Sequence, residues 1–259
     1  MSFVVTTRGD KARAQSICRE LAERVWQGRE RLLPELTPLD DCIAMAVERG
    51  VDPSLEQIII ADVADNPGGG GRGNTSWLLK GLYEGEAKDA ILGVFFDAPL
   101  AAEAHRKGEG ATFMARFNRS ETDQYSESFE AEVQVLNLSN GQIVGRDPGS
   151  RAGMAIDLGP TAVLRLGTVK VVVISIRQQC IDPGYFEAFG VDVETARTVV
   201  VKSRGHFRAG FSVYFRPDQV IECDAPGLTS PNLSNFDWKG FKRPIYPLDM
   251  DTSWTPPDW

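Results

Sequence analysis

Histidine is scarce in this chain of 259 residues, which has only His105 and His206. A catalytic zinc site typically takes three protein ligands, most often histidines, and the HExxH pattern is absent. His105 lies in the polar stretch AAEAHRKGEG, where a histidine at a helix end is typically solvated. One remaining histidine with aspartates would hold a cation only weakly. The sequence therefore argues against a self-contained zinc hydrolase, and we expect this chain alone to bind no metal tightly.

Segments for export or membrane insertion are missing too. The N-terminal stretch MSFVVTTRGDKARAQ has no charged region followed by an apolar one, so it does not predict a signal peptide. The longest apolar runs, such as Val171–Ile176, are far too short to cross a bilayer. Cys18, Cys42, Cys180 and Cys223 lie far apart and form no CxxC pair. These features favour buried, reduced thiols and a cytoplasmic location.

Basic charge is in deficit, with 28 Lys and Arg against 36 Asp and Glu and a net charge of −8. No stripe of Lys and Arg compensates for this deficit, so neither nucleic acid nor a membrane is expected as a partner. The length allows one large α/β domain or two small ones. We expect a single domain over residues 1–259.

Residues 1–109 alternate between strand and helix patterns. This alternation predicts a parallel or mixed sheet with helices packed on it. The expected strands are Phe3–Thr7, Gln57–Asp62 and Ala90–Phe96, and the expected helices are Asp10 to about Arg29, Thr37–Gly50, Thr75–Leu82 and Pro99–Lys107.

Residues 110–225 are rich in β patterns, and residues 226–259 form a tail rich in Pro, Asn, Ser and Trp. The tail composition predicts an irregular wrapping segment. The fold class is therefore α/β, with a mixed sheet, flanking helices, a β-rich middle section and an irregular C-terminal tail. The strands expected after residue 110 are Ala111–Phe117, Phe129–Leu136, Ala155–Leu158, Ala162–Leu166, Lys170–Ile176, Thr198–Lys202 and Val220–Asp224; short helices are expected at Gly184–Phe189 and in HFRAGFSVYF.

The stretch ADVADNPGGGGRGNTSWLL, from Ala61 to Leu79, is the first candidate site. A strand that ends in carboxylates and passes through glycines into a helix is a common place for a ligand in an α/β sheet. Glycine lets backbone N–H groups approach a ligand, and the helix start adds unpaired donors. The loop is neither a Walker A loop nor a GxGxxG motif. The expected contributors are Asp62, Asp65 and Asn66 with the glycines Gly68, Gly69, Gly70 and Gly71, and either aspartate is a candidate cation ligand or a brace for the turn.

The stretch VVVKSRGHFRAGF is the second candidate site. Lys202, Ser203, His206 and Arg208 place a cation, a hydroxyl, an imidazole and a guanidinium around one turn after a strand. Such a group would bind a carboxylate or polarise a carbonyl. A lone Ser-x-x-His is weak support for a nucleophile, because the base must also be oriented by a third group. A purely structural His206 with solvated basic neighbours is the competing interpretation.

Several stretches, taken together and in this order, resemble the C-terminal half of the MlrC (microcystinase C) family. The resemblance runs from the first strand to Asp249, and DNPGGG followed by a KSxxHFRAxF block is a specific pairing. At Asn74 the sequence departs from the family, which carries an acid at that point, so no metal or substrate role is transferred to that position. The stretches are ADNPGGGGRGNTSWLL, GPTAVLRLG, DPGYFEAFGVD, VVVKSRGHFRAGF, DAPGLTSPNL and RPIYPLD.

This resemblance implies a zinc metallopeptidase of roughly twice this length, active on linearised microcystin peptides. It implies metal ligands mainly in an N-terminal domain, which this sequence does not contain, and a C-terminal half that closes the site. Asp65 would orient ligands or the attacking water. The glycine backbone, Lys202, His206 and Arg208 would hold a substrate carboxylate or the developing oxyanion of a small peptide or carboxylate ligand.

Two alternative hypotheses assign the chain a non-catalytic function. The chain would be a non-catalytic module that binds a small anion or metabolite with its glycine-rich loop. Alternatively, it would be a structural partner of a separate metallopeptidase subunit. An isolated half-enzyme would expose a former interface, so we expect either self-association into a homo-oligomer or a partner domain or subunit.

Overall fold

In the computed structural model, which describes residues 2–119, 124–147, 149 and 151–257, the chain forms two compact units. The larger unit is Leu36–Pro231. The smaller unit combines Met1–Glu35 with Asn232–Trp259. The sequence pattern predicted one domain over residues 1–259 and did not indicate this division, because it does not reveal that the two ends of the chain associate with each other.

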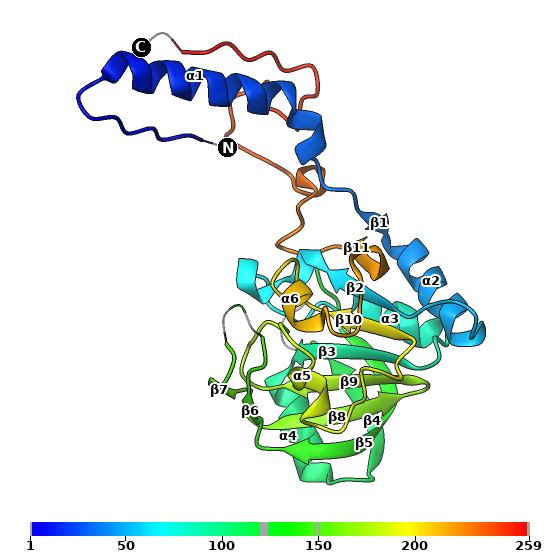
Figure 1. The fold of residues 1–259 in the computed structure, drawn as a ribbon. Helices are drawn as coiled ribbons and strands as arrows, with labels where there is room; N and C mark the ends of the chain where they lie inside the picture. Colours follow the sequence, from blue (N-terminus) through cyan, green and yellow to red (C-terminus); the bar gives the residue numbers. More distant parts are fainter. Residues whose placement is uncertain (1, 120–123, 148, 150, 258–259) are drawn as a thin grey trace. The chain divides into compact units, whose positions relative to one another are not determined.

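The larger unit is built on a nine-stranded mixed sheet within the described residues (Figure 1). The strand order is β1-β11-β2-β10-β3-β9-β8-β5-β4, and β6 and β7 form a separate two-stranded sheet. The α/β class with a mixed sheet and flanking helices is confirmed. The strands are β1 Thr37–Pro38, β2 Ile58–Asp62, β3 Ala90–Phe96, β4 Thr112–Phe117, β5 Phe129–Ser139, β6 Gln142–Val144, β7 Ala155–Asp157, β8 Thr161–Leu166, β9 Val169–Ile174, β10 Thr198–Val201 and β11 Val220–Asp224.

The sheet changes character along its width. The pairs from β1 to β9 in the spatial order are parallel, whereas β9, β8, β5 and β4 are joined by antiparallel pairs. The expected hairpin at Gly167-Thr168 joins β8 to β9. Strand β10 lies between β2 and β3, so a strand from the β-rich section is inserted among strands from residues 1–109. The sequence patterns predicted strands at β2, β3 and β10 but not their lateral order. They did not predict β6, and Thr37–Pro38, which forms β1, was expected to begin a helix.

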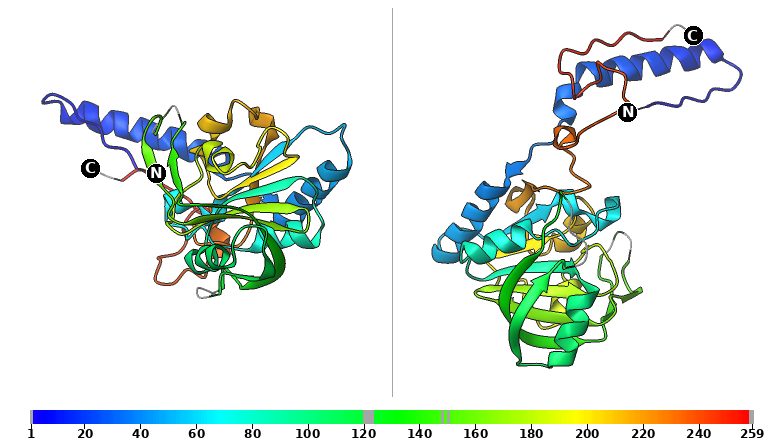
Figure 2. Two further views of the ribbon diagram at one scale, coloured as in Figure 1. Left: turned by 90° about the horizontal axis from the view of Figure 1, so that it is seen from below. Right: turned by 180° about the vertical axis from the view of Figure 1, so that it is seen from behind.

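Helices cover both faces of the sheet (Figure 2). One core combines Ile58 and Ile60 with the helices α2 (Leu39–Val51), α3 (Trp77–Glu84) and α4 (Ala98–Lys107). The other core combines Ile59 and Ala61 with the short helices α5 (Gly184–Glu187) and α6 (Phe207–Phe211) and the β6–β7 ribbon. A strand buried on both faces is expected to be continuously apolar, which explains the run IIIA in β2.

In the smaller unit, the tail packs on the helix α1 (Lys11–Gln27). The Trp26 ring has Tyr246 at 5.8 Å and Trp254 at 6.1 Å between ring centroids, and the Arg29 guanidinium lies 4.5 Å from the Trp26 ring. The tail is irregular, as predicted, apart from a short turn at Leu233–Asn235. Residues 3–7, predicted as a strand, form none, because the structure gives them no strand to pair with.

The four cysteines are free and buried. None of the helices in the described ranges combines the length and the apolar character that crossing a bilayer requires.

Candidate functional site

The two predicted motifs meet at the carboxyl edge of the parallel strands. Strand β2 ends at Asp62, and its neighbour β10 runs directly into Lys202. On the other side of β2, Cys223 of β11 pairs in register with Asp62. Ligands of open α/β sheets bind outside the carboxyl ends of such strands. The sheet therefore brings the glycine loop and the KSRGHFR segment to one place.

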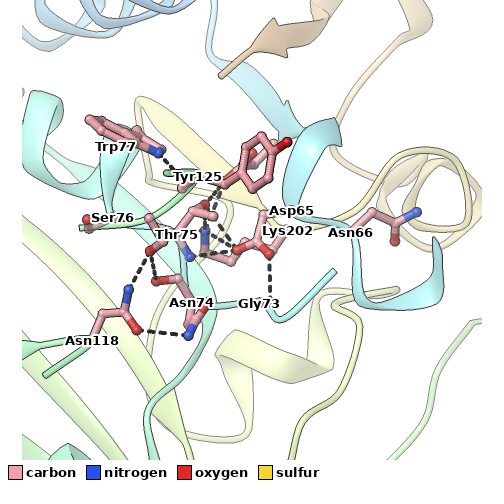
Figure 3. Close-up of polar contacts among 12 residues, drawn as sticks. Asp65, Asn66, Gly73, Asn74, Thr75, Ser76, Trp77, Asn118, Tyr125 and Lys202 are labelled. Atoms are coloured by element: carbon pink, nitrogen blue, oxygen red, sulfur yellow. Dashed lines mark hydrogen bonds and ion pairs between the residues drawn. The ribbon is translucent and has the colours of Figure 1, made fainter. Parts of the chain in front are cut away.

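At this edge lies a buried ionic cluster made of Asp62, Asp65, Thr75 and Lys202. Figure 3 shows Asp65, Thr75 and Lys202 of this cluster. The Lys202 Nζ lies 2.9 Å from Asp62 Oδ2 and 2.9 Å from Asp65 Oδ2. It also donates to the carbonyl oxygen of Thr75 at 2.7 Å and to Thr75 Oγ1 at 3.0 Å. Lys202 is 0% exposed. It was predicted to bind substrate, but its ammonium group is enclosed by protein acceptors instead.

Burial and charge act against each other in this cluster. Burial raises the pKa of Asp62, and the attraction of Lys202 only partly offsets this effect. Burial also acts to raise the pKa of Asp65, but Lys202 and the N–H groups of Thr75 and Gly73 outweigh it and the pKa is lowered. The two carboxylates likewise outweigh burial and raise the pKa of Lys202. The stable core of the cluster is therefore an ionised Asp65–Lys202 pair.

The Asp65 carboxylate shapes the loop. Its Oδ1 accepts from the Gly73 N–H at 2.7 Å, and its Oδ2 accepts from the Thr75 N–H at 2.8 Å. Asp65 is 1% exposed. Its predicted role in orienting ligands or water through direct contact is not supported by this geometry, because both oxygens are engaged in fixing the turn that leads into α3.

The N–H groups of the four glycines are directed inward. Gly69 and Gly71 both donate to the Asn66 carbonyl oxygen at 2.9 Å, Gly70 donates to the Pro67 carbonyl at 3.2 Å, and Gly68 donates to Asn66 Oδ1 at 3.0 Å. A cradle of free N–H groups was predicted here. The observed loop instead uses these donors to close itself.

Steric fit explains two of these glycines. A Cβ on Gly71 would lie 2.7 Å from the backbone nitrogen of Asn66. A Cβ on Gly68 would lie 2.3 Å from Oε1 of Gln179. A Cβ atom does not come this close to an atom to which it is not bonded. A side chain at Gly71 would therefore force the backbone apart, whereas one at Gly68 would displace the Gln179 side chain. The glycines are thus needed for close approach, although the atoms approached belong to the protein itself.

Asn74, at the position where the resemblance led us to expect an acid, is buried in a network of polar side chains. Its Nδ2 donates to Asn118 Oδ1 at 2.9 Å, as Figure 3 shows. The Asn118 N–H donates to Asp97 Oδ2 at 2.8 Å, and its side chain donates to the Ser126 hydroxyl. Asn74 therefore ties the loop to β4 and to the segment before β5.

Above the ionic cluster, the surface has an open depression of about 350 Å³. Four of the predicted site residues line it, namely Asn66, Gly68, His206 and Arg208. Arg208 is paired with Glu222 through a contact of 2.6 Å. The other lining residues are Gln179, Arg204, Gly205 and Glu222. Arg204 is exposed and has no hydrogen-bond or ion-pair partner among the described residues, so its charge is available to an anion.

His206 contacts a residue that the motifs did not indicate. Its Nδ1 lies 3.1 Å from Gln179 Oε1. Gln179 Nε2 donates to Asn66 Oδ1 at 2.8 Å and to Ser203 Oγ at 2.8 Å. Ser203 is buried and serves here as an acceptor beneath the depression. Among the described residues Ser203 forms no hydrogen bond with His206, so the two do not make a Ser–His nucleophile pair there.

Gln179, Arg204 and Glu222 were missed in the sequence for different reasons. Arg204 lies inside the KSRGHFR stretch, so the sequence could have indicated it as a further basic residue in that turn. Gln179 belongs to RQQC, which carries no motif, and Glu222 occupies a strand position without a chemical pattern around it. Only the three-dimensional arrangement shows that they line the depression.

The described residues do not fit a tightly held zinc ion. No group of three or more His, Cys, Asp or Glu side chains in the described part of the chain is arranged to hold a metal. Asp62 and Asp65 were the candidate ligands. Both carboxylates contact the Lys202 ammonium, which occupies the position that a metal ion bound by them would take.

Comparisons with known proteins agree on one family. The model of the family described as MlrC C-terminus matches residues 60–240, which is more than half of the chain. Microcystinase C from Sphingomonas sp. is 26% identical over 209 residues, which are 80% of this chain and 40% of the relative. The crystal structure of a candidate metallopeptidase from Mesorhizobium sp. BNC1 is 26% identical with a TM-score of 0.78, covering 93% of this chain and 47% of that one.

The chain thus spans less than half the length of both relatives. The match includes the glycine loop, the Gln179 segment and the KSRGHFR segment that form the depression. The chain belongs to the MlrC C-terminus family.

Proposed function

We propose that this chain is the domain that completes the substrate site of an MlrC-like zinc peptidase or amidohydrolase. The metal would be held by a region of the longer relatives that this chain does not match. The main support for this proposal is that the acidic and the basic residues at the sheet edge are differently exposed. Asp62 and Asp65 are buried and paired with Lys202, whereas His206, Arg204 and Arg208 line an open depression.

The depression suits a small peptide or another carboxylate ligand. An arginine without a protein partner gives a carboxylate a charge-assisted, two-pronged hydrogen-bonding site. Arg204 is such a residue, whereas Arg208 is already neutralised by Glu222. We therefore assign the carboxylate contact to Arg204 in place of Lys202. His206 would exchange a proton or a hydrogen bond with the substrate, which is the usual work of an exposed histidine in a site.

A partner is part of this proposal, because the depression is open and shallow. The smaller unit exposes large apolar side chains of its tail, with Trp238 at 39% and Phe241 at 52% exposure. Exposed apolar groups of this size, where they gather, mark surfaces that another protein covers. We expect either a metal-holding domain or subunit or a second copy of the chain to be found with it.

The proposal is tested with a hybrid in which this chain replaces the matching part of microcystinase C. We expect the hybrid to bind zinc and to hydrolyse linear peptides, and the isolated chain to do neither. Zinc content and a cooperative melting transition establish first that the hybrid is assembled. A folded, zinc-loaded hybrid without peptidase activity would contradict the proposal, and so would zinc-dependent hydrolysis by the isolated chain.

A non-catalytic anion-binding module remains the second candidate function, and the unpaired Arg204 favours it. This candidate places the anion on the arginine rather than on the glycine loop, since the loop N–H groups are engaged. It requires binding of phosphate or a carboxylate to the isolated chain in the absence of metal, and no gain of hydrolysis in the hybrid.

A further inference from the structure

The side chain of Gln179 bridges the two motifs of the site. It follows β9 in the chain and is half-buried. Its nitrogen donates to Asn66 Oδ1 in the glycine loop and to Ser203 Oγ after β10, both at 2.8 Å. Its oxygen lies 3.1 Å from Nδ1 of His206. Each polar atom of this amide therefore has a partner at hydrogen-bonding distance.

The direction of these hydrogen bonds is fixed by a backbone group. The Gly68 N–H lies 3.0 Å from the Asn66 side chain, and because a backbone N–H only donates, the Asn66 atom that faces it is the oxygen. That same oxygen lies 2.8 Å from Gln179. Two oxygens at this distance would repel each other, so the Gln179 atom there is the nitrogen. Its Oε1 consequently faces His206 as an acceptor.

An acceptor at Nδ1 selects one form of the neutral imidazole. Oε1 of Gln179 offers no proton, so Nδ1 of His206 must carry one. The other ring nitrogen, Nε2, then carries a lone pair. It has no hydrogen-bond partner among the described residues, and His206 is an exposed residue lining the depression.

The glycine loop is shaped to allow this arrangement. The short distance between a Cβ on Gly68 and Oε1 of Gln179 means that only glycine leaves room for the bridge. The backbone N–H of the same residue starts the chain of hydrogen bonds that orients the amide. Gly68 thus leaves room for the Gln179 side chain and also fixes the orientation of its amide group.

We propose that Gln179 is a positioning residue that holds neutral His206 with its proton on Nδ1 and so presents Nε2 as a proton acceptor in the depression. This inference deepens the proposed function and rests on it for the meaning of the site. The partner of Nε2 is then a ligand group with an O–H or N–H, such as a water molecule. If the proton is transferred, the O–H bond breaks, its electron pair stays on oxygen, and a new N–H bond forms at Nε2. The role first expected for His206, as a donor to an oxyanion, needs the protonated ring instead.

Nitrogen-15 NMR of the isolated chain, in alkaline buffer where histidine is neutral, tests this inference directly. We expect His206 to be mainly in the Nδ1–H form, which free histidine disfavours. In Gln179→Leu and in Gly68→Ala the ratio of Nδ1–H to Nε2–H should fall roughly 5- to 10-fold, the ratio set by one hydrogen bond.

Two control variants make the result specific. Gln178→Leu removes the neighbouring glutamine, whose Oε1 accepts from Arg151 Nη1, and should leave the tautomer ratio of His206 unchanged. His105→Gln identifies which signals belong to His206, because the chain has only these two histidines. An Nε2–H form in the unaltered chain, or a ratio that Gln179→Leu does not change, would overturn the inference. The readout needs no substrate or metal, so an inactive hybrid would contradict the proposed function without affecting this result.

Discussion

Replacing Lys202 by methionine is expected to lower the free energy of unfolding by about 3–5 kcal/mol. Methionine has a similar volume, so the loss comes from charge rather than from a cavity. Lys202 is completely buried and lies 2.9 Å from both Asp62 and Asp65. Without the ammonium group, two carboxylates would remain in the interior with no counter-ion. Urea denaturation of the two proteins under identical conditions measures the difference.

Arg204→Met provides the matched control. It removes a cation two residues further along the chain, from an exposed position without a protein partner among the described residues. A surface change of this kind is expected to alter the free energy of unfolding by no more than about 0.5 kcal/mol. If Lys202→Met proved as mild as Arg204→Met, the ionic cluster would not be the structural centre of the sheet edge.

The second large effect concerns His206 in the hybrid with microcystinase C. His206→Ala is expected to lower kcat by roughly 10²- to 10⁴-fold, the usual contribution of a group that transfers a proton in the transition state. His206 is exposed, so the melting temperature of the hybrid should hardly change. Steady-state kinetics on a linear peptide, together with a melting curve of each variant, separates loss of chemistry from loss of folding.

His105→Ala is the control for this experiment. His105 belongs to α4, where its Nε2 is 3.1 Å from the Thr161 carbonyl oxygen, and it does not line the depression. Its removal should leave kcat within a small factor of the unaltered hybrid. Equal activity of the His206→Ala and unaltered hybrids would remove His206 from the chemistry and favour the structural role that the sequence left open.

The sequence predicted the elements around the site well, because their patterns are local. The run QIIIAD indicated β2 to within a residue, and Ala90–Phe96 and Val220–Asp224 are observed as predicted. The mixed sheet, the hairpin between β8 and β9 and the irregular tail also followed from periodicity and composition. The alternation of strand and helix patterns along the chain does not determine the lateral order of the strands. The insertion of β10 between β2 and β3 was therefore not predicted.

The roles of individual site residues were harder to predict, because they depend on which way a group faces. Lysine is rarely buried without a partner, so Lys202 was predicted to face a substrate carboxylate rather than the protein interior. Lys202 is buried because β10 lies next to β2, and Asp62 and Asp65 at the end of β2 pair with its ammonium group. The glycine donors were expected to face outward, but the Asn66 carbonyl accepts two of them. Gln179 reaches the site only through the fold and had no local signal.

A zinc titration of the isolated chain by calorimetry, with Asp65→Asn alongside, tests most directly the claim that this chain is the metal-free half of a site. We expect no stoichiometric site of sub-micromolar affinity in either protein, because the Asp62 and Asp65 carboxylates are paired with the Lys202 ammonium. We also expect Asp65→Asn to be the less stable of the two proteins, because the substitution weakens a buried ion pair. One equivalent of zinc bound with sub-micromolar affinity, and lost in Asp65→Asn, would contradict this claim and identify the aspartate cluster as a metal centre.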